Sequence, residues 1–114
     1  MKSKRSRLCE FSPETKQEIR ERDGGCIFCK IGFRMPPVPL PTQIAHIVPR
    51  SQGGLGVAQN GVVLCIHHHV MMDNGNTGDR ERMLKYITSW YMRKKYPNWN
   101  KDDLIYDKWK DFKG

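Results

Sequence analysis

The sequence predicts an α+β fold with a β-β-α unit at its centre, and three observations lead to this prediction. Two short apolar runs, residues 42–49 and 61–65, have the β-branched composition of strands. Helical signatures lie on either side of them, over residues 12–25 and 77–96. A C-x-x-C pair and a later C-x-x-H pair have the spacing of a metal site that would pin such a small unit together.

Length and charge restrict the class of protein. With 114 residues, the chain has the size of one domain with a modest core. It contains no run of about 18 apolar residues, and its basic N-terminus lacks the apolar stretch of a secretory signal. We therefore expect a cytoplasmic protein without a membrane segment. The net charge of +8 favours a polyanionic partner, although the same charges would also suit a solvated surface.

The first part of the chain is expected to be an arm followed by a helix. Residues 1–10 are basic, and we expect them to be poorly ordered, whereas residues 11–114 are expected to form a single domain. Ser12 suits a helix N-cap, Pro13 suits the first helical position, and Gly24 with Gly25 can end the helix. The stretch "RMPPVPLP" that follows the cysteine pair is too rich in proline for a helix or central strand, so we expect an extended loop.

The β-β-α unit comes next. A strand over residues 42–49 would stop at Pro49, and a second strand is expected over residues 61–65. A helix should begin near Cys65 and end in the turn-forming residues 73–76. The last helix ends at Pro97 and carries one apolar stripe, formed by Met83, Leu84, Ile87, Trp90 and Tyr91. Beyond it, Asn100 suits a cap, but the tail is compatible with either a strand or a helix.

The cysteines predict a structural zinc site. Cys26 and Cys29 can take two corners of a tetrahedron, and Cys65 with His68 has the spacing to supply the other two. The 35 residues between the two pairs hold the strands, so the metal would join the start of the following helix to the C-x-x-C turn. Ordinary buried thiols and a surface histidine are the alternative. Cys9 is expected to be a free thiol, with replacement of His68 as a ligand as the other choice.

The remaining histidines suggest a second metal. His69 and Asp73 are one helical turn apart, so their side chains can converge on a divalent ion. An imidazole and a carboxylate suit Mg²⁺ or Mn²⁺, and they also accept Ni²⁺ or Zn²⁺. His46, on the preceding strand, has the right chemistry for a general base near neutral pH. The alternatives are a surface pair and a structural histidine.

A family resemblance rests on two stretches. "AHIVPRSQGGLG" and "QNGVVLCIHHH" together resemble the motif of the HNH endonucleases, in particular the small zinc-containing proteins of phages and prophages. The resemblance implies a ββα-metal core over about residues 26–75 that is followed by the helix over about residues 77–96. It also implies hydrolysis of DNA by a single divalent ion. The later stretch "YPNWNKDDLIYDKW" is similar to the tail of the same phage proteins.

The resemblance also implies roles for individual residues. His46 would be the general base, and His69 would be a ligand of the catalytic metal, with Asp73 as a second ligand. Asn60 would be the central asparagine that holds the loop of the base, although the pair Asn60-Gly61 is also a strong signal for a tight turn.

The sequence departs from the family pattern in two places. Ala45 stands where a metal ligand often precedes the base, which implies weaker metal binding or reduced activity. His68 stands where a cysteine is commoner, a mild change because imidazole binds zinc well. His67 has no assigned role.

The expected activity is cleavage of DNA with low sequence specificity. Phosphate contacts are expected from four basic residues: Arg50, Lys4, Arg5 and Arg7. The resemblance further suggests a role in phage DNA packaging, with terminase or portal proteins as partners in a bacterial host. Two alternatives remain open: a non-catalytic DNA-binding module stabilised by zinc, and a structural zinc protein that binds another protein.

Overall fold

A computed structural model describes residues 3–107, with the side chain of Thr77 excepted. The first two residues of the predicted arm and residues 108–114 of the predicted domain lie outside the described part. The predicted α+β class is confirmed, because helices surround one antiparallel pair of strands, β1 (Thr42–His46) and β2 (Gly61–Cys65). No helix in the described part is both long enough and apolar enough to cross a bilayer.

The two strands pair from Thr42 opposite Cys65 to His46 opposite Gly61. Residues 47–60 connect them, with short 3-10 helices at Arg50–Gln52 and Ala58–Asn60. The alternative of a tight turn at Asn60 is wrong. Such a turn needs positive φ angles, whereas Gly61 is extended at φ −129° and Asn60 is not among the described residues with positive φ.

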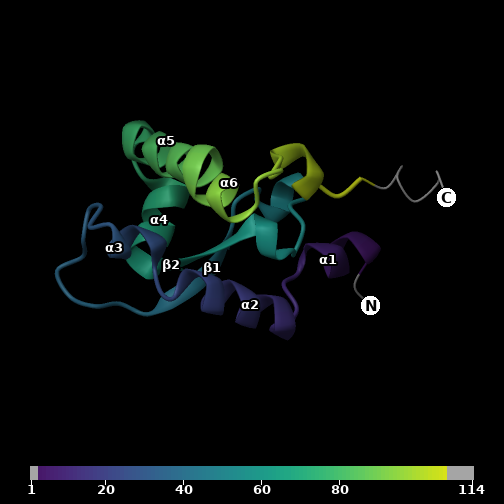
Figure 1. Cartoon of the computed structure of the whole chain (residues 1–114), viewed down its shortest axis with the longest axis horizontal. Helices are drawn as coiled ribbons and strands as arrows, with labels where there is room; N and C mark the ends of the chain where they lie inside the picture. The colour runs from purple at the N-terminus through teal and green to yellow at the C-terminus, as the bar shows by residue number, and fades with distance from the viewer. Residues whose placement is uncertain (1–2, 108–114) are drawn as a thin grey trace.

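Helices cover both faces of the sheet (Figure 1). Helix α2 (Pro13–Asp23) lies on one face, where Ile19 and Val63 are buried in one cluster with Ile44 packed against it. On the other face, α4 (Ile66–Asn74), α5 (Thr77–Tyr86) and α6 (Met92–Lys95) cover the main core. Successive side chains of a strand point to opposite faces of the sheet. The pair Ile44 and Val63 therefore packs toward α2, and the neighbouring pair Ala45 and Val62 packs into the main core. All five residues of β2 are buried.

Helix α2 begins and ends as predicted. The Ser12 hydroxyl accepts a hydrogen bond from the Thr15 backbone N–H, and Pro13 occupies the first helical position. Gly24 ends the helix in the left-handed conformation, at φ 64°, which a residue with a Cβ adopts only with strain.

The expectation of a poorly ordered arm is wrong for residues 4–9. They form helix α1 (Lys4–Cys9), which the Ser3 side chain caps and which buries Cys9. The Leu8 carbonyl accepts a hydrogen bond from the Gly56 N–H at 2.8 Å. The segment is ordered because it packs on the loop that connects the strands, a tertiary contact that its basic composition does not reveal.

The predicted C-terminal helix is one continuous rod, but its apolar stripe is interrupted. A π-helical stretch, Ile87–Tyr91, joins α5 to α6. A π-turn adds one residue and shifts the phase of the following side chains. Met92 is therefore fully buried, whereas Trp90, predicted in the stripe, is 50% exposed under the Lys94 ammonium. The tail then forms a 3-10 helix, Lys101–Leu104, which the Asn100 side chain caps.

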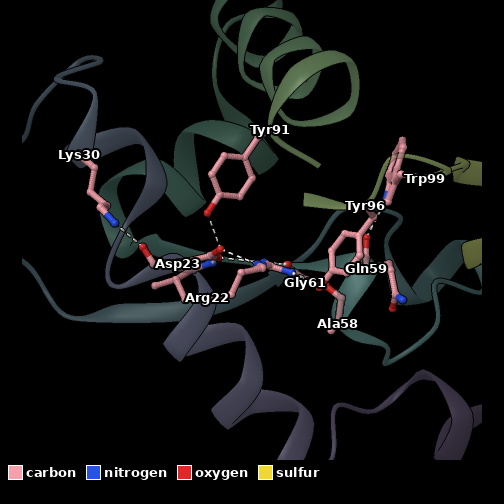
Figure 2. A network of polar contacts seen from close by, with 10 residues as sticks. Arg22, Asp23, Lys30, Ala58, Gln59, Gly61, Tyr91, Tyr96 and Trp99 are labelled. Atoms are coloured by element: carbon pink, nitrogen blue, oxygen red, sulfur yellow. Dashed lines mark hydrogen bonds and ion pairs between the residues drawn. The ribbon is translucent and has the colours of Figure 1, made fainter. Parts of the chain in front are cut away.

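A buried polar network ties α2 to the rest of the fold (Figure 2). Asp23 is fully buried, and its carboxylate accepts hydrogen bonds from the Arg22 guanidinium, the Val63 N–H and the Tyr91 hydroxyl. Arg22 also donates to the carbonyls of Ala58 and Gly61. Burial and the Asp23 hydrogen bond raise the pKa of Tyr91, which keeps its hydroxyl protonated as a donor. A buried carboxylate is tolerated here because several donors compensate it.

Candidate metal centre and active site

The four predicted zinc ligands converge at one point. Helix α3 (Ile27–Lys30) follows Cys26 and carries Cys29, while Cys65 caps the N-terminus of α4 and His68 lies in the first turn of α4. Their ligand atoms all lie within 4.8 Å of one another, and the Cys29 and Cys65 sulfurs are 3.8 Å apart. A tetrahedron around zinc, with Zn–S bonds of about 2.3 Å, has S–S edges of about 3.8 Å. These residues could therefore hold a zinc ion.

The histidine of this group is oriented as a ligand. The Nε2–H of His68 donates to the Phe33 carbonyl at 2.6 Å, which leaves Nδ1 unprotonated and 3.2 Å from the Cys65 sulfur. A second hydrogen bond of this kind is what fixes the tautomer of zinc-binding histidines. Burial, with the neighbouring Cys26 and Cys65 thiols, raises the pKa of Cys29 to about 12, so the metal-free thiol is protonated.

Cys9 is not part of this group. Within residues 3–107, the only set of three or more closely spaced candidate ligands consists of Cys26, Cys29, Cys65 and His68. The alternative in which Cys9 replaces His68 is wrong for this structure, because α1 carries Cys9 to His46 instead.

His46 lies at the end of β1 and is held by the N-terminal segment. Its Nε2 is 2.7 Å from the Cys9 carbonyl, and its ring centroid is 4.2 Å from that of Phe11. A carbonyl only accepts, so Nε2 carries the proton and Nδ1 keeps its lone pair. Burial lowers the pKa of His46 from its ordinary value of 6.5, as does the charge of Arg50, against the opposing hydrogen bond to Cys9. The ring is therefore neutral at neutral pH.

Asn60 secures the loop that follows His46. The side chain is fully buried. Its Oδ1 accepts from the Val48 N–H at 2.8 Å, and its Nδ2 donates to the carbonyls of Val48 and Leu55 at 3.1 and 2.8 Å. The Arg22 contacts to Ala58 and Gly61 hold the backbone on both sides of it. These bonds support the explanation that Asn60 holds the loop of the base.

His69 and Asp73 form the pair that their spacing predicts. The Nε2 atom of His69 is 3.4 Å from an Asp73 carboxylate oxygen. The Nδ1–H of His69 donates to the Gln43 side-chain oxygen at 2.6 Å, so Nε2 is free to bind a metal. An imidazole nitrogen and a carboxylate oxygen so placed fit two positions around a divalent ion. Ala45, on the same strand face as Gln43, is buried in the core and supplies no third ligand.

One cleft is shared by the candidate base, His46, and the candidate metal ligand Asp73. It has a volume of about 560 Å³, and both His46 and Asp73 line it. His69 does not line the cleft, but its Nε2 contacts Asp73, which does. Side chains of α5, α6 and residues 99–102 form the opposite part of the lining.

Two of the four basic residues predicted to contact phosphate, Arg5 and Arg50, make polar contacts within the protein. The Arg5 guanidinium donates to the carbonyls of Arg50 and Ser51, at 3.2 and 3.3 Å. Arg50 lies 3.7 Å from the Glu10 carboxylate. Arg7 and Lys4 lie on α1 and are exposed. His67, which had no predicted role, lies 3.0 Å from the Arg34 carbonyl.

Sequence reasoning missed three groups around the site, namely the Cys9 carbonyl, the Phe11 ring and the Gln43 amide. A backbone carbonyl leaves no mark in a sequence, and Phe11 carried no signal of its own. Gln43 had a weak signal, because it lies two residues before Ala45 and therefore on the face of β1 that meets α4.

These features define an α+β fold of the ββα-metal class, in which a pair of strands and a helix share a group of four candidate zinc ligands. The same unit carries His46, Asn60 and the pair of His69 and Asp73. The family comparison agrees with this class: a family model described as HNH endonuclease matches residues 26–78. This segment of the chain, 53 of its 114 residues, is therefore similar to the HNH endonucleases. Comparison with curated proteins gave no significant match, and neither did comparison with solved structures.

Proposed function

We propose that this protein is a metal-dependent DNA endonuclease that hydrolyses phosphodiester bonds in one nuclease domain, residues 11–114, onto which α1 docks. The observation that carries the proposal is the state of His46. Its Nε2–H donates to the Cys9 carbonyl, so the other ring nitrogen, Nδ1, is an unprotonated acceptor. His46 lines the same cleft as Asp73. The family-model match over residues 26–78 supports nuclease chemistry at this place.

The residues would divide the reaction as follows. Nδ1 of His46 takes a proton from a water molecule, whose oxygen attacks the phosphorus in line with the departing 3′ oxygen. The bond from phosphorus to that oxygen breaks, and the leaving 3′ oxygen takes a proton from solvent water, which gives a 5′ phosphate and a 3′ hydroxyl. Asn60 keeps the loop of the base in place. His69 and Asp73 would hold a divalent ion, Mg²⁺ or Mn²⁺, which as a Lewis acid would stabilise charge on the phosphate and the leaving oxygen.

A plasmid assay tests this function. Supercoiled plasmid should convert to nicked or linear DNA when Mg²⁺ or Mn²⁺ is added and should stay intact without a divalent ion. Asp73→Asn, which keeps the size of the side chain but removes its charge, should slow the conversion at limiting metal. Cleavage that does not depend on metal, or that is equal in the variant, would argue against the proposed site.

A second candidate is a non-catalytic DNA-binding module stabilised by zinc. Ala45 favours it, because this residue contributes no ligand beside the base and is buried in the core. The plasmid assay separates the two candidates, since a binding module would retard DNA in a gel without cutting it in any metal.

The biological setting that we propose rests on the family resemblance alone. In it, the protein acts in the cytoplasm of a bacterial host as an accessory to phage DNA packaging. Its protein partners would be terminase or portal subunits. Co-purification of the tagged protein with those subunits from infected cells is the measurement that would establish this setting.

The Gln43→Ala substitution should weaken the catalytic metal site. Without the acceptor at 2.6 Å, the ring of His69 is free to rotate and to change tautomer, so Nε2 no longer faces Asp73 in a fixed state. Loss of such an outer hydrogen bond typically lowers metal affinity by about 10- to 100-fold. A Mn²⁺ titration of the cleavage rate should show this shift, with the rate recovered at high Mn²⁺. Gln43→Glu keeps an acceptor and should keep the affinity; equal loss in both variants would contradict the role.

A further inference from the structure

Outside the segment that the family model matches, one wall of the cleft is basic. Helix α5, the π-helical stretch and α6 line the cleft with six residues of one helix face: Arg80, Leu84, Lys85, Thr88, Ser89 and Arg93. Lys101 joins them from the tail. All these positions follow residue 78, where the family match ends. The wall therefore lies outside the segment that resembles the family.

The charges of this cleft favour an anion. Its lining carries four cationic side chains, Arg80, Lys85, Arg93 and Lys101, against the carboxylates of Asp73 and Asp102. The other acidic residues of α5 are directed elsewhere, since Asp79 pairs with Arg34 and Arg82, and Glu81 does not line the cleft. The cleft therefore carries an excess of positive charge, with four cations against two carboxylates.

The cations on this wall are available to a ligand. Arg80 and Lys85 are exposed, and within residues 3–107 neither side chain has a hydrogen bond or ion pair. Arg93 is held in place, because its Nε donates to the Thr88 carbonyl at 3.0 Å and its guanidinium lies over the Trp99 ring. Arg5 and Arg50 are less available, since Arg5 donates to two carbonyls and Arg50 pairs with Glu10.

We infer that the α5–α6 wall, formed by Arg80, Lys85 and Arg93, holds the phosphate backbone of the DNA strand beside the scissile bond. This inference rests on the proposed nuclease function and adds where the substrate lies. From Arg80 to Arg93 the helix rises by roughly 20 Å. Phosphates of one strand of a duplex are about 3.4 Å apart along its axis, so the wall spans several of them. Such contacts orient the duplex without reading its sequence.

The test compares two variants that each lose two charges. Arg80→Gln/Lys85→Gln removes cations from the wall. Lys16→Gln/Arg20→Gln removes two exposed cations of α2, on the opposite face of the sheet (Figure 1). Both are made in a His46→Gln background, so that the DNA stays intact. Binding of a short fluorescein-labelled duplex of arbitrary sequence is followed by anisotropy over a range of salt concentrations, and the melting temperature of each variant is recorded.

The wall variant should lose about two units of the slope of log affinity against log salt concentration, because each phosphate contact contributes about 0.9. Near 0.15 M salt, this corresponds to roughly 30-fold weaker binding. The α2 variant should keep the slope of the parent. Equal losses in both variants, or no loss in the wall variant, would overturn the inference even if the wild-type protein cuts plasmid. A parent that does not bind DNA would overturn the proposed function as well, so the two failures are distinguishable.

Discussion

Replacing His46 with glutamine is expected to reduce metal-dependent DNA cleavage by at least about 100-fold, the lower end of what a general base contributes. A glutamine amide can still donate a hydrogen bond to the Cys9 carbonyl, but it cannot accept a proton from water near neutral pH. The substitution therefore keeps the hydrogen bond that positions the side chain and removes the nitrogen that would accept the proton. DNA affinity and melting temperature should therefore remain close to those of the wild-type protein.

The pH dependence of cleavage by the wild-type protein gives the same prediction a second readout. Only the neutral ring accepts a proton, and burial lowers the pKa of His46 below 6.5. The cleavage rate should consequently fall as the pH drops through this lowered pKa, and it should already exceed half of its maximum at pH 6.5. The residual rate of His46→Gln should not show this acidic fall. A variant with wild-type rates, or with the same pH profile, would remove His46 from the reaction.

Loss of the zinc site is expected to have the largest effect on stability. Structural zinc ions in small domains bind with apparent free energies of about 10–16 kcal/mol, as large as or larger than the typical 5–15 kcal/mol that separates folded from unfolded domains. Cys29→Ser should therefore abolish stoichiometric zinc and leave a chain that is largely unfolded by circular dichroism. Prolonged treatment of the wild-type protein with a strong chelator should have the same result.

Cys9→Ala is the matched control for that substitution. Cys9 is also a buried thiol, yet it lies outside the ligand group, and its contact with His46 is made by the backbone. Elemental analysis should find one zinc ion per chain in this variant, as in the wild-type protein. If Cys9→Ala lost its zinc, or if Cys29→Ser kept it and stayed folded, the assignment of the four ligands would be wrong.

Local signals explain why much of the fold was predictable. Ser12, Pro13 and Gly24 mark the ends of α2 because capping depends on residues a few positions apart. The C-x-x-C pair and the C-x-x-H pair were recognisable for a similar reason, since each half of the candidate zinc site is itself a short motif with fixed spacing. His69 and Asp73 meet across one helical turn, which also needs no tertiary information.

The errors have tertiary causes. Residues 4–9 have the composition of a solvated arm, but the contacts of Cys9 and Leu8 with other segments order them as α1. Trp90 fits a helical stripe only if the helix has a uniform period, and the π-helical stretch breaks that period. The tight turn at Asn60 failed because the buried amide bonds the loop at residues 48 and 55 instead.

The parts of the candidate active site come from distant points in the chain, and this has a consequence for protein synthesis. The carbonyl of Cys9 leaves the ribosome early, His46 follows, and the pair His69 and Asp73 emerges only with α4. The wall from Arg80 to Arg93 is made later still. Nascent chains grow at about 5–20 residues per second and fold by domains, so a nascent chain that has not yet reached α4 lacks part of the proposed catalytic set. Under the proposed function, incomplete chains held near nucleic acid on the translating ribosome would accordingly be unable to cut it.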